Sequence, residues 1–151
     1  MCSYNTATIT SAALSPPPTP TLPNSTLTIT GTLSTTGPAG AAVLQLYFAQ
    51  LAPTKWVRYA QQLVAFARVP LPPGPATVPF SLLVQVADMA AWDSEAGAYL
   101  VHAGNYSLSL GLDSASAGAG GRAWTVPVQG AQWCRPAFPG APQCTAGAGG
   151  V

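Results

Sequence analysis

The chain has 151 residues, of which only 6% are charged, against about a quarter in typical soluble proteins. Its formal net charge is +1, and its basic residues are scattered along the sequence. Nucleic-acid binding needs clustered Lys and Arg side chains, so we do not expect this class of partner. We expect no membrane partner either, since no apolar run reaches the ~18 residues that a spanning helix needs.

Composition divides the chain into three parts. Residues 1–23 end in "SPPPTPTLP", which is typical of an extended linker. Residues 24–130 alternate apolar segments with turn signals and are expected to form the folded domain. Residues 131–151 are rich in Pro, Gly and Ala, and predict a mobile tail unless a disulfide closes it. The N-terminus does not resemble a signal peptide, so either the chain is not secreted on its own or Met1 is not the natural start.

Strand-length segments follow one another through the middle part. "STLTITGTLS" alternates apolar residues with threonines, the period of a half-buried strand. Further strands are expected in "AAVLQLYFAQL", "QQLVAFARVPL", "ATVPFSLLV" and "AWTVPVQG". "AWDSEAGAYLV" predicts a tight hairpin with residues 93–95 at its tip. Short alternating strands separated by Gly and Pro turns predict an all-β, antiparallel sandwich.

The stretch "VHAGNYSLSLGLDS" contains another strand, in which Tyr106 follows the turn formed by Gly104 and Asn105. A tyrosine in this position often donates its hydroxyl to nearby backbone, an arrangement called a tyrosine corner. The alternative is that Tyr106 is an inward core residue with its hydroxyl at the rim. His102 precedes the turn and is expected to be an exposed rim residue.

Cysteines and sequons give the signals for covalent modification. Cys2, Cys134 and Cys144 are an odd number, so at least one is unpaired within the chain. A disulfide between Cys134 and Cys144 would close a Pro- and Gly-rich loop, and the alternative is two free thiols on a loose tail. N-x-[ST] triplets make Asn24 and Asn105 candidate glycosylation sites in the secretory pathway.

Three stretches between residues 27 and 114 resemble the fibronectin type III-like domain at the C-terminus of family 3 glycoside hydrolases, the β-glucosidases and β-xylosidases. The first is "LTITGTLSTTGPAGAAVLQLYF". "QQLVAFARVPLPPGPATVPFSL" matches through Leu63, Phe66, Val69, Leu71, Pro73, Gly74, Val78 and Phe80. "VADMAAWDSEAGAYLVHAGNYSLSLGLDS" matches through Asp88, Met89, Trp92, Asp93, Gly104, Tyr106, Leu108, Gly111 and Ser114. The chain departs from the pattern at Ala65, at Ala103 and in the turn at residues 34–37.

The resemblance implies an immunoglobulin- or fibronectin III-like sandwich of about seven strands. It places Phe66, Gly74, Trp92, Gly104, Tyr106 and Gly111 at structural positions of the family, with Trp92 in the core. It also implies a non-catalytic accessory domain that packs on the catalytic domains of a polysaccharide-degrading enzyme, in the same chain or in another. Such an enzyme would be extracellular or in the secretory pathway.

Catalysis by this chain itself is not expected. Retaining glycoside hydrolysis needs two carboxyl groups about 5–5.5 Å apart, and in the resembled family these lie in domains that precede this one. The four acids here are Asp88, Asp93, Glu95 and Asp113. One histidine and three cysteines are too few to predict a metal site, and no cofactor is expected. A weak hydrolase that uses Asp88 or Asp93 is a third interpretation.

The aromatic residues suggest a second function, carbohydrate or protein binding by an independent module. Trp124 alternates with apolar residues and is expected to be buried. Trp56 and Tyr59 lie in a predicted loop and are candidate contacts for a polysaccharide or a protein partner. The alternative is that Trp56 packs over the edge of the sandwich.

Overall fold

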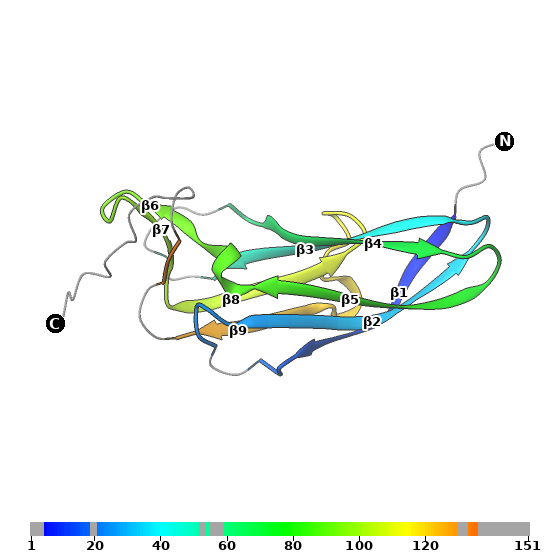
Figure 1. Ribbon diagram of the computed structural model, residues 1–151, viewed down its shortest axis with the longest axis horizontal. Coiled ribbons are helices and arrows are strands. Elements are labelled where there is room, and N and C mark those ends of the chain that lie inside the picture. Colours follow the sequence, from blue (N-terminus) through cyan, green and yellow to red (C-terminus); the bar gives the residue numbers. More distant parts are fainter. Residues whose placement is uncertain (1–4, 19–20, 52–53, 55–58, 130–132, 136–151) are drawn as a thin grey trace.

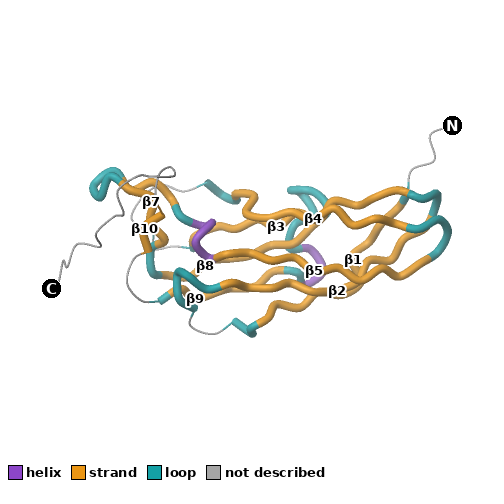
Figure 2. Tube along the Cα trace, viewed as in Figure 1, coloured by secondary structure: helices purple, strands orange, loops and turns teal. Residues whose placement is uncertain are grey.

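A computed structural model describes residues 5–18, 21–51, 54, 59–129 and 133–135. Two antiparallel sheets form a sandwich, with strand orders β1-β2-β5 and β4-β3-β8-β9 (Figure 1). A small third sheet, β10-β7-β6, lies at one end of it (Figure 2). The strands are β1 (Thr6–Ser15), β2 (Thr26–Thr36), β3 (Gly40–Gln50), β4 (Gln62–Leu71), β5 (Ala76–Gln85), β6 (Ala91–Asp93), β7 (Ala98–Val101), β8 (Gly104–Gly111), β9 (Ala123–Val128) and β10 (Trp133–Arg135). Two short 3-10 turns accompany them, η1 (Val86–Met89) and η2 (Ala119–Gly121). The predicted all-β sandwich is confirmed.

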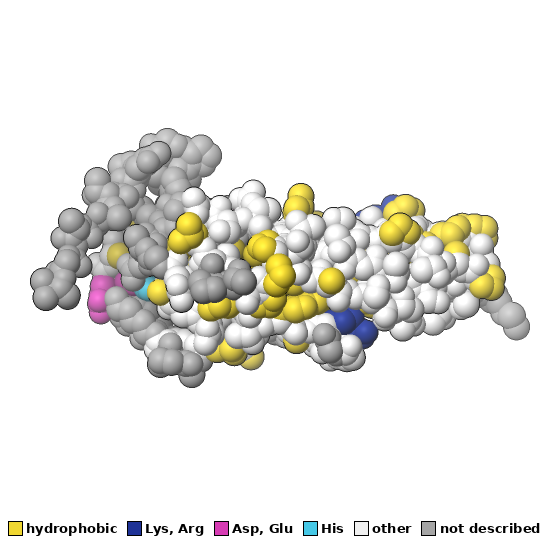
Figure 3. Space-filling view, turned by 90° about the horizontal axis from the view of Figure 1, so that it is seen from below, with side chains coloured by type: hydrophobic (Ala, Val, Ile, Leu, Met, Phe, Trp, Pro, Cys, Tyr) yellow, Lys and Arg dark blue, Asp and Glu magenta, His cyan; other side chains and the backbone are white. Residues whose placement is uncertain are grey.

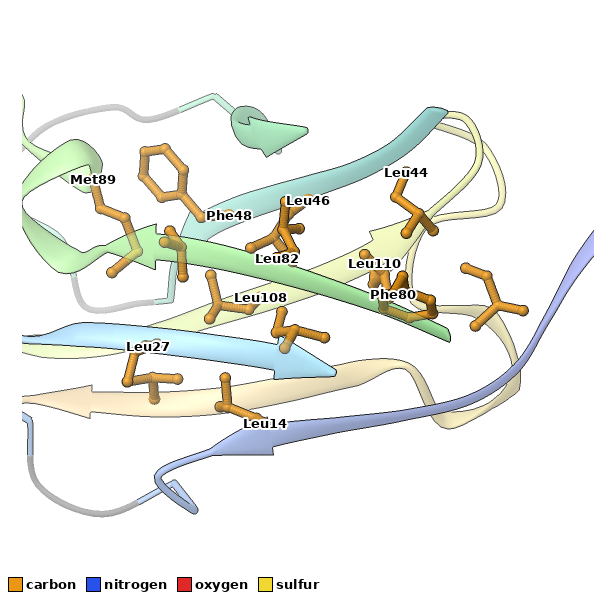
Figure 4. Close-up of a cluster of buried hydrophobic side chains, with 14 of the residues drawn as sticks. Leu14, Leu27, Leu44, Leu46, Phe48, Phe80, Leu82, Met89, Leu108 and Leu110 are labelled. Atoms are coloured by element: carbon orange, nitrogen blue, oxygen red, sulfur yellow. The ribbon is translucent and has the colours of Figure 1, made fainter. Parts of the chain in front are cut away.

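The core lies between the two sheets and follows the period-two pattern of the sequence. Each strand sends alternate side chains inward, where the fully buried residues of one sheet pack against those of the other (Figure 4). The fully buried side chains include Leu27, Ile29 and Leu33 of β2, Leu44 and Leu46 of β3, and Tyr106, Leu108 and Leu110 of β8. Burial of one such side chain contributes about 1.5–3 kcal/mol.

Strand β1 differs from the expectation for residues 1–23. Composition predicted a linker, but β1 pairs with β2 along its whole length and buries Ile9 and Leu14. These two residues are five positions apart, an odd number, so a regular strand would point them to opposite faces. A register shift between Ile9 and Ser11 inserts one extra residue and brings both onto the inner face. The bulge therefore interrupts the period-two pattern by which a strand is predicted from a sequence.

Prolines within the described strands all lie on edge strands. Pro70 is in β4, Pro79 in β5 and Pro127 in β9, and each of these strands pairs with another strand on one side only. On the outer side of β9, Thr21 forms an isolated bridge to Val128. Proline lacks an N–H group and therefore interrupts the ladder of hydrogen bonds in a central strand. The central strands β2, β3 and β8 contain none.

Gly31 is required where β2 pairs with β1, and its replacement is expected to destabilise the fold. A Cβ atom at Gly31 would lie 2.0 Å from the Ser11 carbonyl oxygen and 2.7 Å from Phe80 Cζ. We expect Gly31→Ala to lower the free energy of unfolding in urea by about 1–3 kcal/mol, because β1 must shift. Gly40→Ala is the matched control, since the nearest atoms to its Cβ are 3.8 Å away. That variant is expected to gain about 0.4–1 kcal/mol. Equal urea midpoints for the two variants would contradict the requirement for glycine at position 31.

Candidate interaction surface

The hairpin β6–β7 is held by the buried side chain of Asp93. Trp92 pairs with Tyr99 and Asp93 with Ala98 across the two strands. Asp93 Oδ1 accepts hydrogen bonds from the backbone N–H groups of Glu95 and Ala96, at 3.0 and 3.1 Å. Asp is common in such turns because its carboxylate accepts hydrogen bonds from backbone N–H groups two or three residues further on. The predicted hairpin is present, but its turn is residues 94–97 rather than 93–95, because Asp93 still belongs to β6.

The tyrosine corner is also present. Tyr106 is buried, and its hydroxyl donates a hydrogen bond to the His102 carbonyl oxygen at 3.0 Å. Gly104 adopts a φ of 145° between them, a conformation that side-chain-bearing residues rarely adopt. The hydroxyl thus ties the start of β8 to the end of β7.

His102 was expected on the exposed rim, and this expectation is wrong. Its side chain is buried beneath the hairpin, with Nε2 3.3 Å from Oδ2 of buried Asp93. A carboxylate partner offsets the cost of burying an imidazole, and the imidazole does the same for the carboxylate. The pair connects the hairpin to the tyrosine corner. Asp93 and His102 are nine positions apart in the sequence, and this spacing did not predict their contact.

Trp92 was expected in the core, but half of its surface (50%) is exposed. It points to the side of the hairpin opposite Asp93, because adjacent residues of a strand face opposite ways. There it contacts its cross-strand partner Tyr99 edge to face, with ring centroids 5.3 Å apart. Trp124 is partly buried against the core, so its expected burial is confirmed only in part.

Tyr59 is 76% exposed and lines the same small hollow as Ala91 and Tyr106. The structure therefore brings Tyr59 to the base of the hairpin that contains Trp92 and Tyr99. Its predicted companion Trp56 lies outside the described residues. Exposed aromatic side chains with polar neighbours are typical of surfaces that bind a partner.

The other predicted structural positions are scattered over the sandwich. Gly74 has a φ of 82° in the turn between β4 and β5, and its N–H donates to the Gly37 carbonyl oxygen at 2.7 Å, which joins this turn to the turn between β2 and β3. A Cβ atom at Gly111 would lie 2.8 Å from the Ala117 backbone, so the loop after β8 approaches too closely for any side chain. Phe66 is 67% exposed on β4, far from the core position that its apolar character suggests.

The candidate modification sites remain predictions. Asn24 and Asn105 are exposed, as glycan attachment requires. Cys134 lies in β10, where its backbone pairs with Leu100 of β7, so the predicted tail contributes a strand. Cys144 lies outside the described residues.

The carboxylates have different surroundings. Asp88, Glu95 and Asp113 are exposed, whereas Asp93 is buried in the hairpin. Hydrogen bonds from Ser116, one of them from the Ser116 backbone N–H at 2.7 Å, lower the pKa of Asp113.

Figure 3 shows acidic side chains beside the histidine at one end of the molecule, and few other charges on the visible face. Within the described ranges, no three His, Cys, Asp or Glu side chains form a group that could hold a metal ion.

No helix in the described part of the chain is long and apolar enough to cross a membrane.

Comparisons with known proteins show what this domain is similar to. Residues 42–114 match the family model described as the fibronectin type III-like domain. No similar sequence was found among curated proteins. Among solved structures, β-glucosidase 3B from Thermotoga neapolitana matches with a TM-score of 0.68 and 23% identity, over 87% of this chain and 17% of that chain. A β-glucosidase from Kluyveromyces marxianus matches at 0.66 and 22%, over 87% and 15%. A GH3 β-glucosidase from Bifidobacterium adolescentis matches at 0.67 and 21%, over 83% and 17%.

The chain therefore spans less than a fifth of the length of these β-glucosidases. At this level of identity the likeness shows the fold alone. The family model begins at Ala42, inside β3, so β1 and β2 complete the sandwich ahead of the matched region.

The tyrosine corner can be tested by removing one hydroxyl. We expect Tyr106→Phe to lower the free energy of unfolding by about 1–3 kcal/mol, because the buried His102 carbonyl loses this donor. Tyr99→Phe is the matched control, since Tyr99 is exposed, and it should change stability by less than about 0.5 kcal/mol. Urea denaturation of both purified variants measures the difference, and equal losses would rule out a special role for the corner.

Proposed function

We propose, from the match of residues 42–114 to the fibronectin type III-like family model, that the chain is a non-catalytic accessory domain of a family 3 glycoside hydrolase. It packs on the catalytic domains, in the same polypeptide or in a second one, and stabilises them. The observation behind this proposal is the shared fold: more than four-fifths of this chain matches a small part of several β-glucosidases. The rest of each such enzyme supplies other domains for it to contact.

The surroundings of the acidic residues agree with an accessory role. Both oxygens of Asp93 are engaged inside the hairpin, with the turn N–H groups and with His102. The Asp93 carboxylate therefore stabilises the hairpin. A retaining hydrolase instead needs a pair of carboxyl groups that flank the scissile bond. On this proposal that pair lies in the hydrolase domains, and the substrate is a β-glucoside or β-xyloside. The exposed sequons at Asn24 and Asn105 support a location outside the cell or in the secretory pathway.

The size of the native protein tests the proposal. With an antibody against residues 24–130, we expect an immunoblot of the source to show a species far larger than the 15.3 kDa of this chain. Peptide mass spectrometry of that species should find hydrolase domains. A 15.3 kDa species that co-elutes with a glycoside hydrolase in gel filtration would equally support the proposal, as the two-chain form. A species near 15.3 kDa that elutes alone would overturn it.

Carbohydrate binding is the second candidate function, and the 76% exposure of Tyr59 favours it. Sugar rings stack on exposed aromatic side chains, and Tyr59 has Trp56 three residues before it in the sequence.

Affinity electrophoresis in gels that contain cell-wall polysaccharide tests this second candidate. Migration should be retarded, and the retardation should be lost in Trp56→Ala and Tyr59→Ala, which remove the stacking surface. Phe66→Ala is the matched control, because Phe66 is an exposed aromatic residue on β4 rather than beside the hairpin. Absence of binding at millimolar sugar would exclude this function.

A further inference from the structure

The outer surface of β3 and β4 contains a continuous apolar area. Val43 lies opposite Arg68, Gln45 opposite Phe66, and Tyr47 opposite Leu63. Residues directly opposite one another in an antiparallel pair share a face. Since the alternate residues Leu44 and Leu46 are fully buried, these three pairs face away from the core. We call these six residues the β3–β4 face.

The apolar members of the β3–β4 face are well exposed. Phe66 is 67% exposed and Leu63 51%, while Val43 is also exposed. Tyr47 is half-buried, and its hydroxyl donates a hydrogen bond to the Gln45 side chain of the same strand. An exposed Phe, Leu and Val on successive rungs form a patch rather than isolated surface residues.

The outer surface of the other sheet is different. Its central strand β2 presents Thr28, Thr30, Thr32 and Ser34, which pair with Leu83, Ser81, Pro79 and Thr77 of β5. Hydroxyl groups there bond to one another, as Thr32 does with Thr10 and Ser11, at 2.8 Å each. Leu83 is 65% exposed, but its cross-strand partner is a threonine. Among the described residues of the two outer surfaces, the β3–β4 face is the one that combines an exposed aromatic residue with exposed aliphatic neighbours.

The charge of the β3–β4 face indicates the chemistry of its partner. Arg68 is the one charged residue among the six that form the β3–β4 face. Aromatic residues and Arg are enriched in the centres of protein interfaces, where Lys, Asp and Glu are depleted. The complementary surface is an apolar protein patch with a carboxylate opposite Arg68. A neutral polysaccharide offers neither the carboxylate nor the aliphatic area.

We propose that the β3–β4 face is the surface by which this domain docks on the hydrolase domains, and that Phe66 and Leu63 are its apolar anchors. The inference rests on the proposed function and adds to it the face and the chemistry of the contact. A carboxylate of the hydrolase lies opposite Arg68. The Thr- and Ser-rich face of β2 and β5 stays in solvent.

Site-specific crosslinking tests the choice of face. A photoreactive phenylalanine analogue, p-benzoylphenylalanine, replaces Phe66 in the natural full-length polypeptide, and Leu83 in a matched control. Both side chains are similarly exposed and lie on opposite faces of the sandwich, so neither replacement disturbs the core. We expect irradiation to link position 66, and not position 83, to a peptide of the hydrolase domains. In the two-chain form, Phe66→Ser should weaken association by about tenfold or more, and Arg68→Glu should also weaken it.

The outcomes separate the two proposals. If the native protein contains hydrolase domains but position 66 forms no link to them, or position 83 links equally well, the choice of face is wrong and the accessory function stands. A link from position 66 to a second copy of this chain also overturns the choice of face. If no hydrolase accompanies the native protein, the accessory function fails and this inference fails with it.

Discussion

The structure depends on the alternation of inward and outward side chains along the strands of the sandwich. Because only 6% of residues are charged, apolar burial between the two sheets supplies most of the stabilisation. The same alternation decides the outer surfaces, since each inward leucine of β3 or β4 fixes which neighbours face solvent. Core and candidate docking face are therefore two consequences of one pattern, and a shift of one residue in register would exchange them.

The sequence was sufficient to predict the strands whose alternation is regular, and therefore the fold class and most of the core. It was insufficient for β1, because the bulge after Ile9 breaks the period that makes a strand recognisable. Tyr106 could be placed because a glycine turn precedes it. The contact between Asp93 and His102 could not, since it depends on how the hairpin folds back on the corner. Trp92 was misplaced because the family resemblance put it in the core, whereas hairpin geometry directs it outward.

The exposed groups of the domain are divided between its hairpin end and the side of the sandwich. The hairpin end contains acidic side chains and the histidine (Figure 3), together with the exposed rings of Trp92 and Tyr99, whereas the apolar patch lies along the side of the sandwich. An accessory domain needs a firm framework and a surface that fits a larger neighbour. The buried pair beneath the hairpin and the tyrosine corner make the framework rigid where the small third sheet leaves the sandwich.

The prolines of β4, β5 and β9 have a consequence for solubility. A protein with a net charge of +1 has little electrostatic repulsion to keep its copies apart. Open sheet edges are templates on which other chains can add strands, which is the first step toward aggregates and amyloid. A proline in each of these edge strands and the bulge in β1 interrupt that template. Strand addition at these edges is thus opposed by the backbone itself, where a net charge of +1 offers little repulsion.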